Sequence, residues 1–477
     1  MTIEFNNIPN NIRKPGLYSE YNDSLAVQGI SFEAKTMVIL GQKLSTGTGV
    51  DNVPVKVFGS DKGDEICGAG SVAALAIRAA FTANKNIQLS VVPIPDGAGS
   101  AAVGTITISG IASSTGSFVV WVGNVRTEIT VNNLDAVNDI SEAIFDALVI
   151  NQANMPVIFT HAAPVITMTA KNKGNLGNNI PVSFLNNNVG TSNLAVVQPT
   201  DGATDPAITT ALTNIFPADY DQIFCTLNDA TNLALLKTHL TNAAAPTEGR
   251  RSTGYFGYTG VQATLETLCG TTLNYERMSV GYLPYGKTTE MAHSLDYEVG
   301  AAYASIVAKQ SDPARPFNGL SLPGIAPSAL ENQLSRTQQE SLLLNGATPL
   351  EVGVGSSVNI VRAITTYTQN AAGVKSIAWL DLTSILSMDF GSGAIDDRLA
   401  LRFPRAKLTD RTVNLVKSQI MDVIRILVKL EIWLSVDEDE VIVEKDGNVI
   451  GRINNQIPGK VVPGMHIIAN RYDLILN

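Results

Sequence analysis

The stretch Ile223-Phe-Cys-Thr-Leu227, followed by a helical pattern over Asn228–Ala244, decides the fold class. These five residues form a short apolar run typical of a buried strand. The same succession recurs at Met278-Ser-Val-Gly-Tyr282, which precedes a predicted helix over Glu290–Lys309. Strands that alternate with helices build sheets with parallel pairing. We therefore predict an α/β core.

Toward the N-terminus the same pattern continues and is then interrupted. Thr36–Leu40 and Val55–Phe58 read as strands and Ser71–Asn84 as a helix. Between Asn86 and Asp205, only 11 of 120 residues are charged, against 65 of 357 in the rest of the chain, and all twelve tyrosines lie outside this segment. A shift of this size predicts a separate domain inserted into the core.

The inserted segment reads mostly as strands. Gly123-Asn124 separates two alternating runs, which predicts a hairpin, and one helix is predicted over Ala136–Asn151. The predicted organisation is an N-terminal arm (1–25), a first part of the core (26–85), a β-rich inserted domain (86–205), a second part of the core (206–455) and a C-terminal arm (456–477).

The last third carries the longest predicted helix, Asp410–Glu431, with Thr409 as its N-cap and an apolar stripe at helical spacing. After it, Glu440–Glu444 and Val449–Ile453 predict a hairpin around a turn at residues 445–448. Both chain ends are extended in pattern and partly apolar. Such tails suit strand addition to a neighbour's sheet, and equally suit pairing within their own subunit.

Composition excludes several classes of function. The chain has a net charge of −10, and only 16% of its residues are charged. This argues against a general nucleic-acid binder or a binder of anionic membranes. The N-terminus lacks the pattern of a secretory signal, and no apolar run is long enough to span a bilayer. Cys67, Cys225 and Cys269 are far apart and are expected to be free thiols.

The candidate chemical motifs are weak. Gly68-Ala-Gly70-Ser-Val-Ala73 fits a dinucleotide fingerprint, but no adjacent strand or later acidic residue supports it, so a tight turn into a helix is favoured. Asp396-Asp397 is interpreted as a solvated turn. The histidines His161, His239, His293 and His466 lack metal-site spacing. We expect no cofactor, no metal and no enzymatic activity.

Several stretches in the right order resemble the tail sheath proteins of Mu-like contractile bacteriophages. The resemblance runs over essentially the whole chain. Its motifs are Arg13-Lys-Pro-Gly-Leu-Tyr-Ser-Glu-Tyr21, Ala170-Lys-Asn-Lys-Gly-Asn-Leu-Gly-Asn-Asn-Ile180, Asp312-Pro-Ala-Arg-Pro-Phe-Asn-Gly-Leu-Ser-Leu-Pro-Gly-Ile325, Val361-Arg-Ala-Ile-Thr-Thr-Tyr-Thr-Gln-Asn370 with Trp379-Leu-Asp-Leu382, and Arg402-Phe-Pro-Arg-Ala-Lys-Leu408.

The resemblance implies a structural protein of a virion tail, assembled in the cytoplasm of a bacterial host. Its fold would be an α/β (α+β) sheath core with a β-rich inserted domain and extended N- and C-terminal arms. Subunits would polymerise as stacked hexameric rings around a tail tube and contract to drive the tube through the host envelope. The implied partners are further copies of the chain, the tube protein, and baseplate and tail terminator proteins, without nucleic acid or direct membrane insertion.

The resemblance also favours strand exchange between neighbouring subunits. The arm contacts are expected at Tyr18, Tyr21, Ile468, Asn470, Tyr472, Leu474 and Leu476, and the receiving hairpin at Val441, Val443, Val449 and Ile453. The tube-facing residues are expected to be Arg398, Arg402, Arg405, Lys407, Arg425 and Lys429, although part of this basic cluster reads equally well as a solvated helix end. The alternatives are the sheath of a tailocin or another contractile injection system, and an adhesin on the tail surface.

Overall fold

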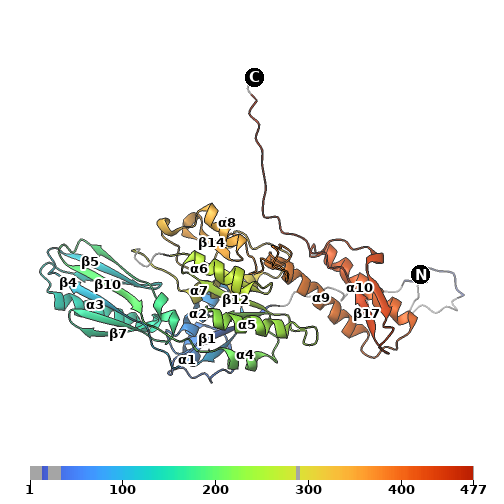
Figure 1. The fold of residues 1–477 in the computed structure, drawn as a ribbon, viewed down its shortest axis with the longest axis horizontal. Coiled ribbons are helices and arrows are strands. Elements are labelled where there is room, and N and C mark those ends of the chain that lie inside the picture. Colours follow the sequence, from blue (N-terminus) through green and yellow to red (C-terminus); the bar gives the residue numbers. More distant parts are fainter. Residues whose placement is uncertain (1–12, 20–33, 286–289, 476–477) are drawn as a thin grey trace.

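The computed structural model describes residues 13–19, 34–285 and 290–475. Three parts follow one another along the longest axis (Figure 1). A β-rich unit from residues 103–200 lies at one end, a large sheet with its helices lies in the middle, and a helical unit from residue 382 onward lies at the other end. The last residues project away from this body as an extended segment.

The central sheet has eight strands in the order β15-β14-β13-β12-β11-β1-β3-β2. Its six inner strands pair in parallel, and a short antiparallel strand closes each edge. This confirms the predicted α/β core with parallel pairing. The strands are β1 (Thr36–Gln42), β2 (Val55–Val57), β3 (Gln88–Ile94), β11 (Gln222–Cys225), β12 (Thr253–Tyr258), β13 (Met278–Tyr282), β14 (Thr348–Val352) and β15 (Val358–Ile360).

Three inner strands, β3, β12 and β14, escape the sequence patterns. Pro93 interrupts the apolar run of β3, and Gly254 and Gly257 dilute that of β12. In the sheet Gly257 is required, because a Cβ there would collide with the backbone of Asp296 and Gly300 in the helix above it. Gly257 thus weakens the apolar pattern by which the strand could be recognised, and the same residue lets the helix pack closely on the strand.

Helices accompany the sheet in the expected alternation. They are α1 (Ser60–Cys67), α2 (Val72–Ala83), α4 (Thr209–Ile215), α5 (Ala230–Ala243), α6 (Gln262–Thr267), α7 (Asp296–Lys309) and α8 (Arg336–Leu344), with a π-helical turn η3 (Leu268–Leu273) and 3₁₀ turns η4 (Leu330–Asn332) and η5 (Val354–Ser356). The prediction that the helix before Pro313 begins at Glu290 is wrong. It begins at Asp296, because the carboxylate of Glu298 accepts a hydrogen bond from the backbone N–H of Leu295 at 2.9 Å and caps the first turn there.

The β-rich unit contains two antiparallel sheets and one helix. The sheets have the orders β10-β4-β8-β7 and β6-β5-β9. The predicted hairpin at Gly123-Asn124 is confirmed, since Val122 pairs with Val125. The elements are β4 (Val103–Ser109), β5 (Gly116–Val122), β6 (Val125–Val131), α3 (Val137–Asn151), η1 (Gln152–Asn154), β7 (Val157–Ala162), β8 (Val165–Ala170), η2 (Asn175–Asn179), β9 (Val182–Asn187) and β10 (Asn193–Thr200).

The helical unit near the C-terminus has a core of its own. It is built from α9 (Leu382–Arg402), α10 (Asp410–Lys429), η6 (Glu438–Glu440), β16 (Ile442–Lys445) and β17 (Ile453–Gln456). As predicted, the Thr409 side chain caps α10, accepting from the N–H of Thr412 at 3.2 Å. The interpretation of Asp396-Asp397 as a turn is wrong, because both residues lie inside α9. Gly391, Gly393 and this acidic pair have low helix propensity, which hides α9 in the sequence.

Helix α9 joins two hydrophobic cores. Leu382, Ile385 and Leu386 belong to the large core of the central sheet, whereas Ile395 belongs to a second core with α10 and Trp433. A bidentate ion pair from Arg277 to Asp389, at 2.6 and 2.8 Å, ties the middle of the helix to the central part. The helical unit is therefore attached through a continuous helix and not through a loop.

Candidate assembly surfaces

The C-terminal hairpin has a longer turn than the sequence predicted. Strands β16 and β17 pair from Ile442–Gln456 to Lys445–Ile453, so the second strand starts at Ile453 and not at Val449. The carboxylate of Asp446 accepts from the N–H groups of Asn448 at 2.8 Å and Val449 at 2.9 Å, and from Asn454 Nδ2 at 3.0 Å. These bonds stabilise a seven-residue turn, 446–452, in place of the predicted four-residue turn, 445–448.

The four residues predicted on the receiving hairpin therefore lie in different surroundings. Val443 and Ile453 lie on the strands and pack against the second core. Val441 precedes β16 and is itself a buried member of that core. Val449 lies in the turn, half exposed, so its placement on a strand is wrong.

Both outer edges of this sheet are open. Within the described residues, β16 and β17 pair only with each other. A two-stranded sheet is marginally stable alone, and its unpaired N–H and C=O groups form a template for a further strand. Packing of α10 against β16 supports one face of the hairpin and leaves the edges exposed. The hairpin can thus accept one strand on each side.

The C-terminal segment is exposed and rich in apolar side chains. In the described part of the chain, residues 467–475 form no helix or strand and every one is exposed. The exposed apolar side chains include Ile468, Tyr472 and Leu474, which are 71%, 90% and 85% exposed. By contrast, residues 457–462 pack back on the helical unit, with the N–H of Val462 bonded to the carbonyl of Ile432 at 3.1 Å. Leu476 lies outside the described residues.

Less is described of the N-terminal arm. Tyr18 is 44% exposed, and its hydroxyl donates to the carbonyl of Lys14 at 3.0 Å. This bond is local and holds only the short segment 13–19. Tyr21, the other predicted arm residue, lies outside the described residues.

The six residues predicted to face a tube form two separate groups. Arg398 and Arg402 lie in the last turns of α9, and Arg405 and Lys407 lie in the loop that follows. Arg425 and Lys429 lie at the far end of α10, which at 1.5 Å per residue is roughly 30 Å from its first turn.

Of these six residues, only Arg425 forms an ion pair within the described part of the chain. Arg425 pairs with Asp422 at 3.1 Å. The structure adds Arg411 to the first group. None of the cations in this enlarged group makes an ion pair within the described residues. We call this group the basic tip; it consists of Arg398, Arg402, Arg405, Lys407 and Arg411. Arg411 belongs to this set because it lies in the first turn of α10, directly after the loop. It also continues the run of basic residues that begins at Arg398 in the sequence.

The crevice where α/β folds usually bind ligands is filled by the chain itself. Such ligands lie at the carboxyl ends of strands where the strand order reverses, here between β1 and β11. At this position Gln42, the last residue of β1, donates to Asp96 Oδ1 at 3.0 Å and to the carbonyl of Lys173 at 2.7 Å. Asn172 also donates to Asp96, at 2.8 Å. Residues 171–173 of the β-rich unit thus occupy the crevice.

The same residues complete the glycine turn that resembled a cofactor fingerprint. Asn172 Oδ1 accepts from the N–H of Val72, the first residue of α2, at 3.0 Å. Lys171 Nζ donates to the carbonyl of Ala69 at 3.0 Å, and burial lowers the pKa of this amine to about 8. An amide and an ammonium from the chain therefore stand where a phosphate would bind, which agrees with the interpretation as a structural turn.

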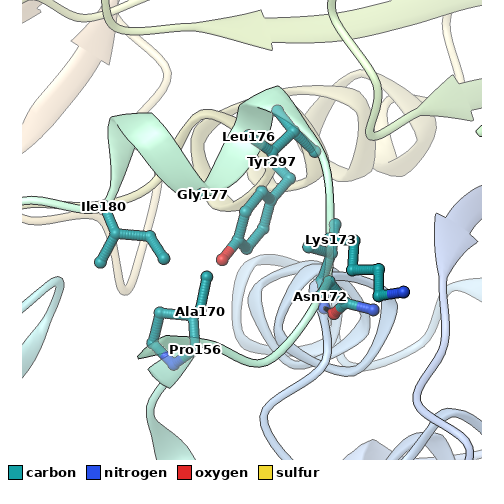
Figure 2. A pocket seen from close by; sticks show the side chains of 9 residues that line it. Pro156, Ala170, Asn172, Lys173, Leu176, Gly177, Ile180 and Tyr297 are labelled. Carbon is teal, nitrogen blue, oxygen red and sulfur yellow. Dashed lines mark hydrogen bonds between the residues drawn. The ribbon is translucent and has the colours of Figure 1, made fainter. Parts of the chain in front are cut away.

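The cavity beside this turn is too small for an organic ligand. Tyr297, Leu176 and Pro156 line this cavity (Figure 2). Its volume is about 10 Å³, enough for one water. The hydroxyl of Tyr297 is buried and has no hydrogen-bond partner within the described residues. This site can hold a structural water between the β-rich unit and α7.

The remaining titratable groups are structural. Burial raises the pKa of the Cys67 and Cys225 thiols to about 12, and all three cysteines are buried and free. Burial lowers the pKa of His239 to about 4, with the nearby Arg250 contributing in the same direction. Among the described residues no cluster of histidine, cysteine and carboxylate side chains could hold a metal ion, and no helix there could cross a membrane.

Comparison with known proteins agrees with this arrangement. Residues 201–366 match the central domain of phage tail sheath proteins. The whole chain is 26% identical over 496 aligned residues to a Mu-like prophage tail sheath protein of Haemophilus influenzae, with both proteins covered completely.

Two solved structures share the fold. A chain of the anti-feeding prophage baseplate in its contracted state has a TM-score of 0.53 at 12% identity, over 98% of each chain. The sheath tail protein of Listeria innocua has a TM-score of 0.51 at 16% identity, over 90% of this chain and 92% of that one. This chain is therefore similar over its whole length to a Mu-like prophage tail sheath protein, and it shares the fold of solved sheath tail proteins.

Proposed function

We propose that this chain is the repeating subunit of a contractile tail sheath. Subunits polymerise as stacked six-fold rings around a tail tube, and contraction of the polymer drives the tube through the host cell envelope. The homology to sheath proteins along the full length supports this role. The tube, baseplate and terminator proteins are its partners at the inner surface and the two ends of the polymer.

One observation carries the proposal at the level of residues. A two-stranded sheet with two open edges lies in the same chain as an exposed, apolar, extended C-terminal segment. Nine residues, 467–475, span at most about 30 Å when extended. This segment adds to the β16–β17 sheet of a neighbouring subunit, and the N-terminal arm, with Tyr18 and Tyr21, takes the other edge.

Strand exchange explains how the lattice survives contraction. Main-chain hydrogen bonds in the exchanged sheet do not depend on how the larger parts of the subunits are oriented. Contraction is then a switch between two packings of rigid bodies. The extended polymer is kinetically trapped, so assembly stores the energy and no nucleotide is required.

The β-rich unit lies on the outside of the proposed polymer. Its strands carry few charges, which limits repulsion between many copies of a chain whose net charge is −10. Its buried residues belong to the same hydrophobic core as the central sheet. The unit therefore moves with the central part during contraction.

Removal of the C-terminal segment tests the proposal. Deletion of residues 467–477 leaves Val461 and the hairpin in place, so the truncated chain should fold and unfold like the full chain. It should stay monomeric in sedimentation and form no tubes in negative-stain images. Ordinary tubes from the truncated chain would contradict strand exchange through this segment.

A matched pair of variants isolates the backbone contribution. Asn470→Pro removes one N–H donor from the segment and should prevent assembly, whereas Asn470→Ala keeps the donor and should assemble. The same images separate the alternative functions. Slender fibres would favour a tail adhesin. Tubes that assemble without a phage particle are expected both for a phage tail sheath and for the sheath of an injection system.

A further inference from the structure

The C-terminal segment leaves the body at one buried side chain, His466. Its side chain is only 10% exposed, whereas its neighbours Met465 and Ile467 are 76% and 81% exposed. From Ile467 to Ile475 every residue is exposed. His466 is thus the last side chain held against the body. The end of the chain that follows projects away from the body (Figure 1).

Segments far apart in the sequence meet at this imidazole. Nδ1 of His466 lies 2.9 Å from Asn318 Nδ2, and Nε2 lies 3.3 Å from Asp381 Oδ1. Arg362 holds the Asp381 carboxylate with two hydrogen bonds of 2.8 and 2.9 Å. Since Asp381 directly precedes α9, the ring is fixed to the junction between the central part and the helical unit.

The hydrogen bonds define the state of the ring. Burial lowers the pKa of His466, and the opposing effect of Asp381 is smaller, so the imidazole is neutral at neutral pH. A neutral ring that accepts from Asn318 at Nδ1 carries its proton on Nε2. Nε2 lies near the Asp381 carboxylate, at 3.3 Å, but forms no hydrogen bond within the described residues, so the bond to Asn318 is the one that fixes the ring.

The backbone before His466 is also closely packed. A Cβ on Gly464 would lie 2.7 Å from Cγ of Pro316. Any larger residue would push the chain away from the segment that carries Asn318. The backbone at Gly464 is therefore confined by Pro316, and the next residues are confined by the contacts of the His466 side chain.

We propose that His466 is a positioning residue: together with Asn318 and Asp381 it forms a clasp that sets the direction in which residues 467–475 leave the subunit. The clasp presents this segment to the neighbouring hairpin, and in this respect it rests on the proposed function. Without the clasp, the free segment would begin nearer to Pro463, and more backbone would have to be ordered on docking.

A distance measurement on dilute, unassembled protein tests the clasp independently of assembly. Nitroxide labels at Ile467→Cys and Val354→Cys report on the segment and on an exposed site of the body, and the three native cysteines are buried. The distance distribution should be narrow with His466 present, and His466→Ala should broaden it at least about twofold. Met465→Ala is the matched control and should leave the distribution unchanged. Partial restoration by His466→Gln would show that hydrogen bonding is responsible.

Assembly provides the second measurement. His466→Ala should raise the protein concentration needed for tube formation severalfold, and Met465→Ala should not. Asn318→Ala removes the partner from the other side and gives a second route if His466→Ala unfolds. If the distance distribution of the native chain is as broad as that of His466→Ala, the clasp is overturned. If His466→Ala broadens the distribution but does not change the concentration needed for assembly, the role of the clasp in presenting the segment is overturned. If no variant and no native protein forms tubes while the distances still respond, the clasp stands and the proposed function fails.

Discussion

At the scale of single residues, the first turn of α7 holds one buried carboxyl group, that of Asp296, and one partly buried carboxyl group, that of Glu298. Asp296 accepts from Asn179 Nδ2 and Asn228 Nδ2, each at 3.0 Å, and from the hydroxyl of Thr259. It thereby joins the β-rich unit to two loops at the carboxyl ends of the central strands. Glu298, one residue beyond Tyr297, accepts a hydrogen bond from the Leu295 N–H, and burial raises its pKa from 4.5 to about 7.

Glu298 should therefore make stability fall as pH rises. Between about pH 4.5 and 7 the folded chain holds a proton on Glu298 that the unfolded chain has lost, and each unit of difference corresponds to about 1.4 kcal/mol. In Glu298→Gln the side chain stays neutral, so the variant should gain stability relative to the native chain between pH 5 and pH 8. Thermal unfolding at the two pH values measures this.

The exposed helix residue Glu340 provides the control. Glu340→Gln removes the same charge from the surface and should change the melting temperature equally at both pH values. If Glu298→Gln behaved in the same way, Glu298 would not be the partly buried acid described above.

At the scale of elements, α9 shows how one helix can use glycines in two ways. A Cβ on Gly391 would overlap the indole ring of Trp433, whose Nε1 donates to the carbonyl of Ser387 at 3.1 Å. A Cβ on Gly393 would meet nothing within 4 Å. The first glycine is needed for packing of the helical unit, and the second only lowers helix propensity.

The two glycines predict opposite mutational effects. Gly391→Ala must displace Trp433 and should destabilise the helical unit by about 1–3 kcal/mol. Gly393→Ala should stabilise α9 by about 0.5–1 kcal/mol, since alanine restricts the unfolded backbone and favours the helix. Denaturant unfolding followed by tryptophan fluorescence measures both. Two changes of the same sign would contradict the close approach of Trp433.

At the scale of the whole molecule, the basic tip stands out in an acidic chain. Five cations lie at one end of the α9–α10 pair, while the net charge is −10. Such a local excess of unpaired cations fits a partner surface rich in carboxylates. In the proposed polymer this partner is the tail tube.

Charge reversal at the tip should separate tube binding from self-assembly. Arg405→Glu with Lys407→Glu should abolish assembly templated by the tube, while the subunit still folds and forms tubes of its own. Arg425→Glu with Lys429→Glu makes the same change of charge at the other end of α10 and should have a smaller effect. Co-sedimentation with purified tubes at low and high salt measures the difference, and equal loss in both variants would argue against the tip as the contact.

Some features could be read from local sequence because they depend on local physics. The apolar run at Ile223, the helix capped by Thr409 and the hairpin at Gly123-Asn124 follow from periodicity, capping and turn chemistry. Helix α9 could not be read this way, since Gly391 makes sense only beside Trp433. The turn after β16 was mispredicted because Asp446 reaches over to Asn454, a contact that periodicity does not reveal.

By itself, the sequence predicted a parallel α/β core, a segment with few charges, partly apolar chain ends and motifs that resemble those of tail sheath proteins. Only the tertiary structure decided that residues 171–173 fill the ligand crevice, that the basic residues split into a tip and a distant pair, and that His466 meets Asn318 and Asp381. The physical reason is the range over which each interaction acts along the sequence. Backbone propensity and side-chain alternation act between near neighbours, whereas the filled crevice and the contacts of His466 join residues more than 80 positions apart, which only the packed fold brings together.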